Sequence, residues 1–138
     1  MTAKLELRNA GEILGMGGPF MGDLFVDGAL VDNEVMDEAM NTEDGEWCVY
    51  VKYSCEGRWR KDVRFRVCAY HVKSKQLVQH ERAVEMLVLY GVQRTAIAVK
   101  VAFHKQYAGR LIRIPLPVLS PEGKIAKPWS QVGTTPTK

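Results

Sequence analysis

The segment from Asp23 to Glu46 contains no lysine and no arginine, although it carries nine carboxylates. These acidic residues are Asp23, Asp27, Asp32, Glu34, Asp37, Glu38, Glu43, Asp44 and Glu46. Because like charges repel, a surface sorted in this way suits an encounter with a partner better than it suits folding. The segment also lacks a calcium-binding loop, since the third and fifth positions from Asp32 are Glu34 and Met36.

Cysteine is scarce, and no long apolar run is present. The three cysteines leave one unpaired whatever their connectivity, which favours a reducing compartment over a disulfide scaffold. The first residues, 1–9, contain no apolar signal core, and no run approaches the length that spans a bilayer. A chain of 138 residues fits one domain with a sizeable core. The sequence therefore predicts a cytoplasmic single-domain protein.

Recognisable nucleotide and metal motifs are absent as well. The glycine-rich stretch 11–22 is followed by Asp23 and Leu24, where a phosphate-binding loop needs lysine and a hydroxyl. Cys68 and His71 are three residues apart on an expected strand, which places them on opposite faces. We therefore expect no cofactor and no metal site. A loose cation site among carboxylates of the acidic segment stays open as an alternative.

Catalytic signatures are equally missing. The chain has only four serines, and none stands in a nucleophile elbow. The sequence predicts a protein that is not an enzyme. A small hydrolase or nuclease with an unrecognised site, using His80 or His104, is the third function considered.

What the sequence does contain is an alternation of apolar and polar residues with a period of two, which is typical of strands with one buried face. We expect strands at 4–8, 23–26, 47–53, 62–72, 76–79, 95–103 and 110–114. Residues 34–40 could form a short helix, and 81–90 could be helix or strand, of which we favour strand. The prediction is an all-β, single-domain antiparallel barrel or sandwich of about eight to ten strands, with at most one short helix.

The end of the chain differs in composition. Five of the six prolines follow Ile114, which excludes a central strand or a long helix there. We divide the chain into a β domain at 1–114 and a proline-rich, extended C-terminal tail at 115–138. Trp129 is the lone aromatic residue of the polar end, so it either belongs to an ordinary terminus or anchors a partner.

Between Lys52 and Lys75 the charge balance reverses, with eight basic residues against two acidic ones. One expected strand face combines cations with aromatic rings, which is typical of single-stranded nucleic-acid binding. The residues concerned are Arg58, Trp59, Arg60, Lys61, Arg64, Arg66 and Tyr70. The competing interpretation is a solvated strand face that the acidic segment neutralises.

Two resemblances add expectations. The run Thr42-Glu43-Asp44-Gly45-Glu46-Trp47 resembles the turn that opens strands in β-propeller blades, and 66–71 with 75–77 resembles the hairpin of those blades. Four blades would exceed this chain, so a full propeller is excluded.

The order of motifs in the first half of the chain is similar to small bacterial all-β proteins. It comprises Gly11-Glu12-Ile13-Leu14, Met16-Gly17-Gly18-Pro19, 23–28 and 42–45. Some such proteins are immunity proteins of contact-dependent growth inhibition or other polymorphic toxin systems. The resemblance implies a protein partner, namely a basic toxin or effector domain that the chain binds and blocks. The resemblance supplies no contact residues. The sorted charges and the lone Trp129 do, and the expected contact residues are Asp32, Glu34, Asp37, Glu38, Glu43, Asp44, Glu46 and Trp129.

Overall fold

The structure is a computed structural model that describes residues 3–12, 20–36, 39–55, 63–84, 86–102 and 108–132. Over these ranges the chain forms eleven antiparallel strands in two sheets and no helix. The all-β prediction is confirmed, with one strand more than the upper expected number and with no closed barrel among the described residues. No helix in these ranges could span a membrane.

The larger sheet takes most of the chain. Its order is β1 (Leu5–Glu12), β2 (Phe20–Val26), β3 (Ala29–Met36), β5 (Trp47–Cys55), β6 (Val63–His71), β7 (Gln76–Val84) and β11 (Trp129–Gln131), with β4 (Met40–Asn41) beside β5. The β2–β3 hairpin closes through Asp27 and Gly28, whose φ angles are 50° and 85°. Positive φ at both positions is the geometry of a type I′ turn, as the Asp-Gly pair predicts.

The smaller sheet has the order β10 (Leu111–Pro115), β9 (Ala96–Lys100), β8 (Val88–Val92). Strand β9 lies at its centre and buries Ile97, Ala98 and Val99 in succession. Ile97 and Val99 enter the cluster under the smaller sheet, whereas Ala98, on the opposite face of the strand, does not belong to that cluster.

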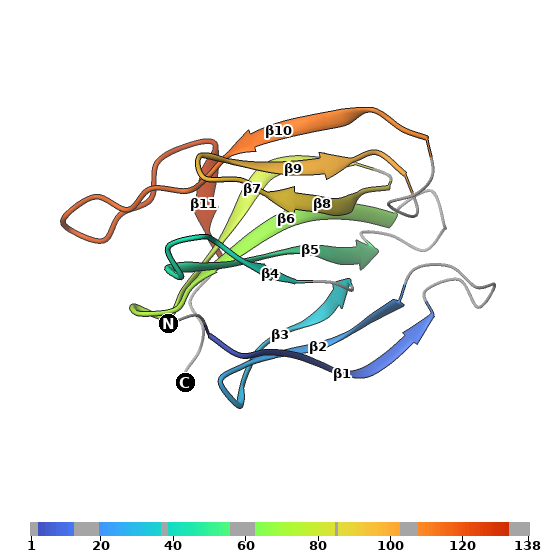
Figure 1. The fold of residues 1–138 in the computed structure, drawn as a ribbon, viewed down its shortest axis with the longest axis horizontal. Helices are drawn as coiled ribbons and strands as arrows, with labels where there is room; N and C mark the ends of the chain where they lie inside the picture. Colours follow the sequence, from blue (N-terminus) through green and yellow to red (C-terminus); the bar gives the residue numbers. More distant parts are fainter. Residues whose placement is uncertain are drawn as a thin grey trace.

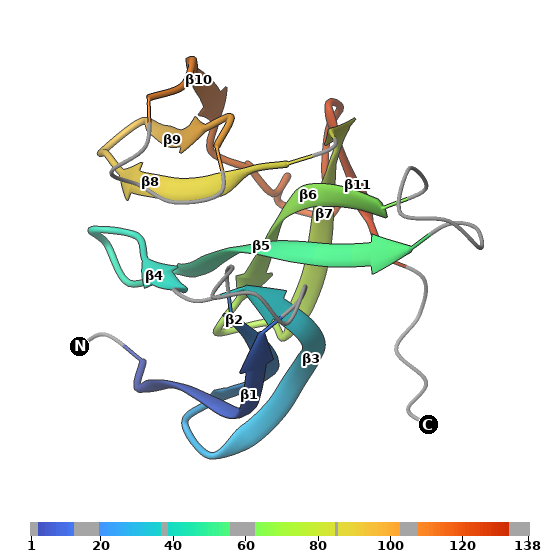
Figure 2. The ribbon, with the colours of Figure 1, turned by 90° about the vertical axis from the view of Figure 1, so that its right-hand side faces the viewer.

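The strands of the two sheets are arranged in three layers. Figures 1 and 2 show β8–β10 on one side of β5–β7 and β1–β3 on the other. Two of these layers, β1–β3 and β5–β7, belong to the larger sheet, which bends between β3 and β5. Val35 and Lys52 are the one registered pair between those two strands. The middle layer, β5–β7, is therefore covered on both faces, and it separates two hydrophobic clusters.

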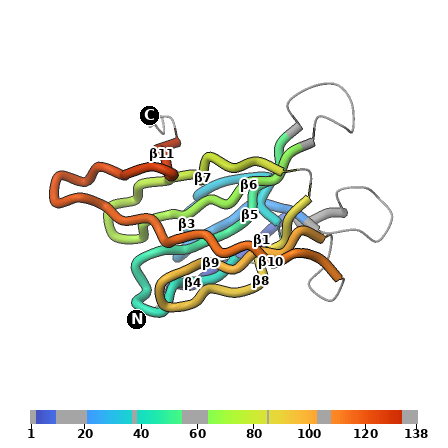
Figure 3. Tube along the Cα trace, turned by 90° about the horizontal axis from the view of Figure 1, so that it is seen from above, coloured from blue at the N-terminus to red at the C-terminus, as the bar shows by residue number. Residues whose placement is uncertain are grey.

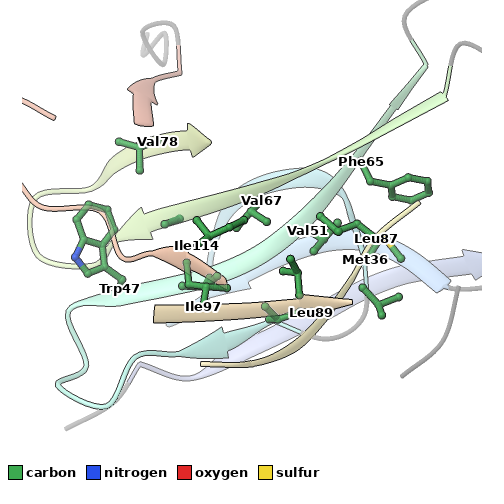
Figure 4. Packing of buried hydrophobic residues seen from close by; sticks show 14 of the residues in the cluster. Met36, Trp47, Val51, Phe65, Val67, Val78, Leu87, Leu89, Ile97 and Ile114 are labelled. Carbon is green, nitrogen blue, oxygen red and sulfur yellow. The ribbon is translucent and has the colours of Figure 1, made fainter. Parts of the chain in front are cut away.

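Alternation along β5 decides which residue enters which cluster. Trp47, Val49 and Val51 join the cluster under the smaller sheet, which Figure 4 shows beside Ile97, Ile114 and Leu89. Cys48 and Tyr50 point the opposite way and pack in the cluster against β1–β3. Both faces of β5 are apolar, so this strand is central to the fold.

The ambiguous segments are strands in the described ranges. Residues 34–36 end β3, whereas Asp37 and Glu38 lie outside the described residues. The segment 81–90 divides between the end of β7 and the start of β8, so the preference for strand over helix is confirmed.

The proline-rich segment returns to the sheet. In Figure 3 it runs out beside the β6–β7 hairpin and back to β11, which pairs with β7. Trp129 is 3% exposed and belongs to the cluster under the smaller sheet. Its indole Nε1–H donates a hydrogen bond to the carbonyl of Pro115 at 3.0 Å. The expected tail thus contributes an edge strand and a core side chain.

Candidate partner-binding groove

A groove of about 520 Å³ opens at one end of the interface between the sheets. Four segments that are distant in sequence form its walls. They contribute Asp44, Glu46 and Trp47; His71; Arg94 and Thr95; and Pro115, Leu116, Pro117, Val118 and Leu119. We call this the acidic groove. It brings the turn that opens β5 next to the start of the proline-rich segment.

The turn between β4 and β5 fixes the carboxylates at the rim. The Thr42 hydroxyl donates a hydrogen bond to Asp44 Oδ1 at 2.7 Å, and the backbone N–H of Glu46 donates to the same oxygen at 2.9 Å. The Trp47 N–H in turn donates to Thr42 Oγ at 3.1 Å. Gly45 has a φ of 75°, a conformation that favours glycine. The turn is therefore held by its own short side chains.

The same contacts tune the acidity of Asp44. The hydrogen bond from the Thr42 hydroxyl, followed by that from the Glu46 amide, lowers the pKa of the Asp44 carboxyl below its ordinary value. Hydrogen bonds to a carboxylate stabilise its charged form. Asp44 is consequently an anion at neutral pH, and it is exposed beside the groove.

His71 lies at the end of β6 against Trp47. The ring centroids are 4.7 Å apart, and His71 Nδ1 lies 2.7 Å from Ser74 Oγ. On the other side of the ring, Nε2 lies 3.7 Å from a carboxylate oxygen of Glu46. The His71 ring is half-buried and lines the groove.

Arg94 comes from the turn between β8 and β9 and meets the acidic turn. Its Nε lies 3.1 Å from Glu43 Oε1, and both side chains are exposed. Ion pairs of this kind contribute about 0–1 kcal/mol because water screens them. Arg94, a cation of the same chain, thus lies against the edge of the acidic turn.

The opposite wall is apolar. Leu116 and Leu119 pack on the cluster under the smaller sheet, whereas Val118 is 73% exposed. Two prolines restrict the backbone of this wall. Carboxylates on one side and aliphatic groups on the other suit a lysine or arginine, whose head is charged and whose stem is apolar.

Two other acidic residues that were expected to contact a partner, Asp32 and Glu34, do not line the groove. Asp32 faces into the fold, where it accepts hydrogen bonds from Tyr50 and Lys52. Glu34 is exposed on β3, in the layer beyond the central strands. Among the described residues of the acidic segment, which leave out Asp37 and Glu38, only the 43–46 part contacts or lines the groove.

The expected nucleic-acid face on β6 is partly covered. Arg64, Arg66 and Tyr70 are half-buried, and Cys68 between them is buried. Tyr70 packs against the cluster shared with β1–β3. The residues expected to complete that face, 58–61, lie outside the described residues. A flat platform for bases therefore does not form along the described part of β6.

The groove residues that sequence reasoning missed are Trp47, His71, Arg94, Thr95 and the segment 115–119. No local motif marks them, because each becomes part of the groove only when the two sheets pack. The Pro115-Leu116-Pro117 run is the one sequence signal available, since alternating prolines indicate a restrained extended chain. In the described ranges, no group of three or more His, Cys, Asp or Glu side chains is placed to hold a metal ion.

No protein-family model, no curated protein and no solved structure matches this chain. The similarity to immunity-type proteins accordingly stays a prediction.

Proposed function

We propose that this chain is a protein-binding module that receives a basic, extended segment of a partner protein in the acidic groove. The observation that carries the proposal is the hydrogen-bonded turn, which holds Asp44 and Glu46 on one wall of a groove whose other wall is apolar. A pre-organised wall binds at a smaller cost in conformational entropy than a flexible one.

The form of binding we favour is immunity-type inhibition of a toxin or effector domain. Enzymes that act on nucleic acids have basic active-site surfaces, because they must attract phosphates. A protein that presents fixed carboxylates beside apolar contacts would be attracted to such a surface and would cover it. Binding rather than catalysis is therefore the proposed activity.

The location of binding can be tested by NMR. An amidated peptide that alternates arginine and valine is added to the ¹⁵N-labelled protein, and the amide shifts are followed. We expect the largest shifts at the turn 42–47, at Arg94 and Thr95, and along 116–119.

The matched control is a peptide in which glutamate replaces every arginine. It should leave the groove signals unchanged, because it retains the valines and the extended shape but reverses the charge. Shifts of similar size with both peptides, or shifts confined to Glu34 and its neighbours on β3, would contradict the proposal.

A further inference from the structure

The smaller sheet belongs to a stretch of the chain without a single carboxylate. Between Glu85 and Glu122 there is no aspartate or glutamate. The same stretch contains five cations, namely Arg94, Lys100, Lys105, Arg110 and Arg113. The stretch therefore carries an excess of positive charge in sequence, although Arg94 pairs with Glu43. The proposed protein-binding function makes no use of this stretch beyond Arg94, Thr95 and the apolar wall.

The register of the smaller sheet divides its side chains between two faces. Ile97, Val99 and Ile114 point toward the larger sheet and enter the hydrophobic cluster. Lys100 pairs with Leu111, and Arg113 follows two residues later, so these three side chains share the opposite face. In Figures 1 and 2 that face is turned away from the larger sheet.

The outer face combines apolar and cationic groups. Tyr90 is 45% exposed and Leu111 is 52% exposed. The ammonium nitrogen of Lys100 lies 4.9 Å from the centroid of the Tyr90 ring, which places both on this face. Arg110 and Arg113 are exposed as well. An exposed aromatic ring and an exposed leucine among cations form a surface that attracts anions and that also offers apolar contact.

We propose that this outer face of β8–β10 binds single-stranded nucleic acid without sequence preference. Lys100 and Arg113 are diagonal neighbours on adjacent strands, a separation of about 7–8 Å between Cα atoms. Two cations at this separation contact different phosphates of one strand, while Tyr90 and Leu111 receive the bases. Stacking is tolerant of sequence, because every base has a π face.

Single-stranded nucleic acid fits this face better than an acidic protein does. The face presents an exposed tyrosine and an exposed leucine on a short sheet, and β platforms with an aromatic side chain are suited to splayed bases. A duplex would hide its bases in the stack and leave Tyr90 and Leu111 without a partner. This inference is independent of the acidic groove, which lies at the turn 42–46.

The test measures fluorescence anisotropy of a labelled oligouridine strand titrated with the full chain. Two labelled comparison strands of the same length are used, one abasic and one a duplex. We expect the oligouridine to bind several-fold more tightly than the abasic strand. With about two phosphates neutralised, log K should fall with log salt at a slope of about −1.4.

Charge reversal locates the site. Arg113→Glu should weaken oligouridine binding about tenfold, because it removes one phosphate contact and adds a repulsive charge. Lys73→Glu is the matched control: Lys73 is exposed in the β6–β7 turn and undergoes the same change of charge. Equal weakening by both variants would mean that binding follows net charge alone, and it would overturn the proposal.

Substitution of the aromatic ring tests stacking. Tyr90→Ala should abolish the preference for oligouridine over the abasic strand, whereas Tyr90→Phe should keep it, because the ring face remains. Equal binding of the oligouridine and the abasic strand to the unaltered chain would show a general polyanion site. That result, tighter binding of the duplex, or no binding at about 50 mM salt would overturn the proposal.

Discussion

Asp32 and Lys52 form an ion pair across β3 and β5, with 2.6 Å between the carboxylate oxygen Oδ1 and the ammonium nitrogen. The other carboxylate oxygen accepts a hydrogen bond from the buried Tyr50 hydroxyl at 2.7 Å. The acidic and basic segments of the sequence thus meet inside the fold at this position. One carboxylate of the acidic segment consequently serves stability, while those of the turn 43–46 remain exposed.

Removal of the Asp32 carboxylate should destabilise the protein. Asp32→Ala leaves the Tyr50 hydroxyl buried without this acceptor, and we expect a loss of about 2 kcal/mol in the free energy of unfolding. In a double-mutant cycle with Tyr50→Phe, measured by urea denaturation, the coupling energy should be about 1 kcal/mol. Strictly additive effects would show that the hydrogen bond contributes nothing to stability.

His80 should make the stability sensitive to acid. It is 8% exposed, its Nδ1 accepts a hydrogen bond from the Arg82 N–H, and its ring packs edge-on against Trp129. Burial lowers the pKa of His80, while Glu81 opposes and Arg82 supports this shift. The unfolded chain therefore takes up a proton at a higher pH than the folded one.

The resulting stability is constant above the unfolded pKa of about 6.5 and decreases as the pH falls below it. Calorimetry at about pH 7.5 and about pH 5.5, one unit either side of that pKa, compares the unaltered chain with His80→Gln, which cannot titrate. The thermal midpoint of His80→Gln should fall less between the two values. Parallel decreases in the two proteins would contradict this account.

Cys48 and Cys68 should be inert thiols in the folded state. Burial raises the pKa of each to about 12, so little reactive thiolate exists at neutral pH. In a Cys55→Ser background, a disulfide reagent should label neither thiol in native buffer and both in denaturant. Rapid labelling of the native protein would mean that the central strands open readily.

Asp44 should stabilise the acidic turn only while it is ionised. Its pKa is lowered in the fold, so its contribution is present above the unfolded value of about 3.9 and is lost as the pH falls through the folded value. Asp44→Asn should lower the thermal midpoint at neutral pH, and the difference should shrink in acid. A difference that is independent of pH would show that charge is unimportant in this turn.

The period-two pattern was sufficient to predict the fold class, because alternation reports directly which side chains of a strand are buried. It could not predict the layers. Along β6, the arginines alternate with apolar residues and indicate an open basic face, yet Cys68 and Tyr70 on that face pack against β1–β3. That contact depends on the bend between β3 and β5, and a local sequence pattern carries no information about such a bend.

Part of the candidate site could be predicted from the sequence. Asp44 and Glu46 were expected to contact a partner, and they line the groove. Arg94 and the 115–119 segment could not be predicted, because their proximity to the turn arises from packing between sheets. Trp129 was expected either in an ordinary terminus or at an interface, but its buried indole fills the core and leaves it outside the proposed surface.

The central claim is that the carboxylates of the acidic groove select a cationic partner segment. The most direct measurement is a calorimetric titration of the arginine–valine peptide into the unaltered chain and into a Glu43→Lys/Glu46→Lys variant. Glu34→Lys/Glu81→Lys is the matched control: it makes the same charge change at exposed positions that do not line the groove, whereas Glu46 lines it and Glu43 pairs with the lining residue Arg94. We predict that the groove variant weakens affinity at least about tenfold and that the control weakens it less than about threefold. Equal affinities of the two variants would contradict the account.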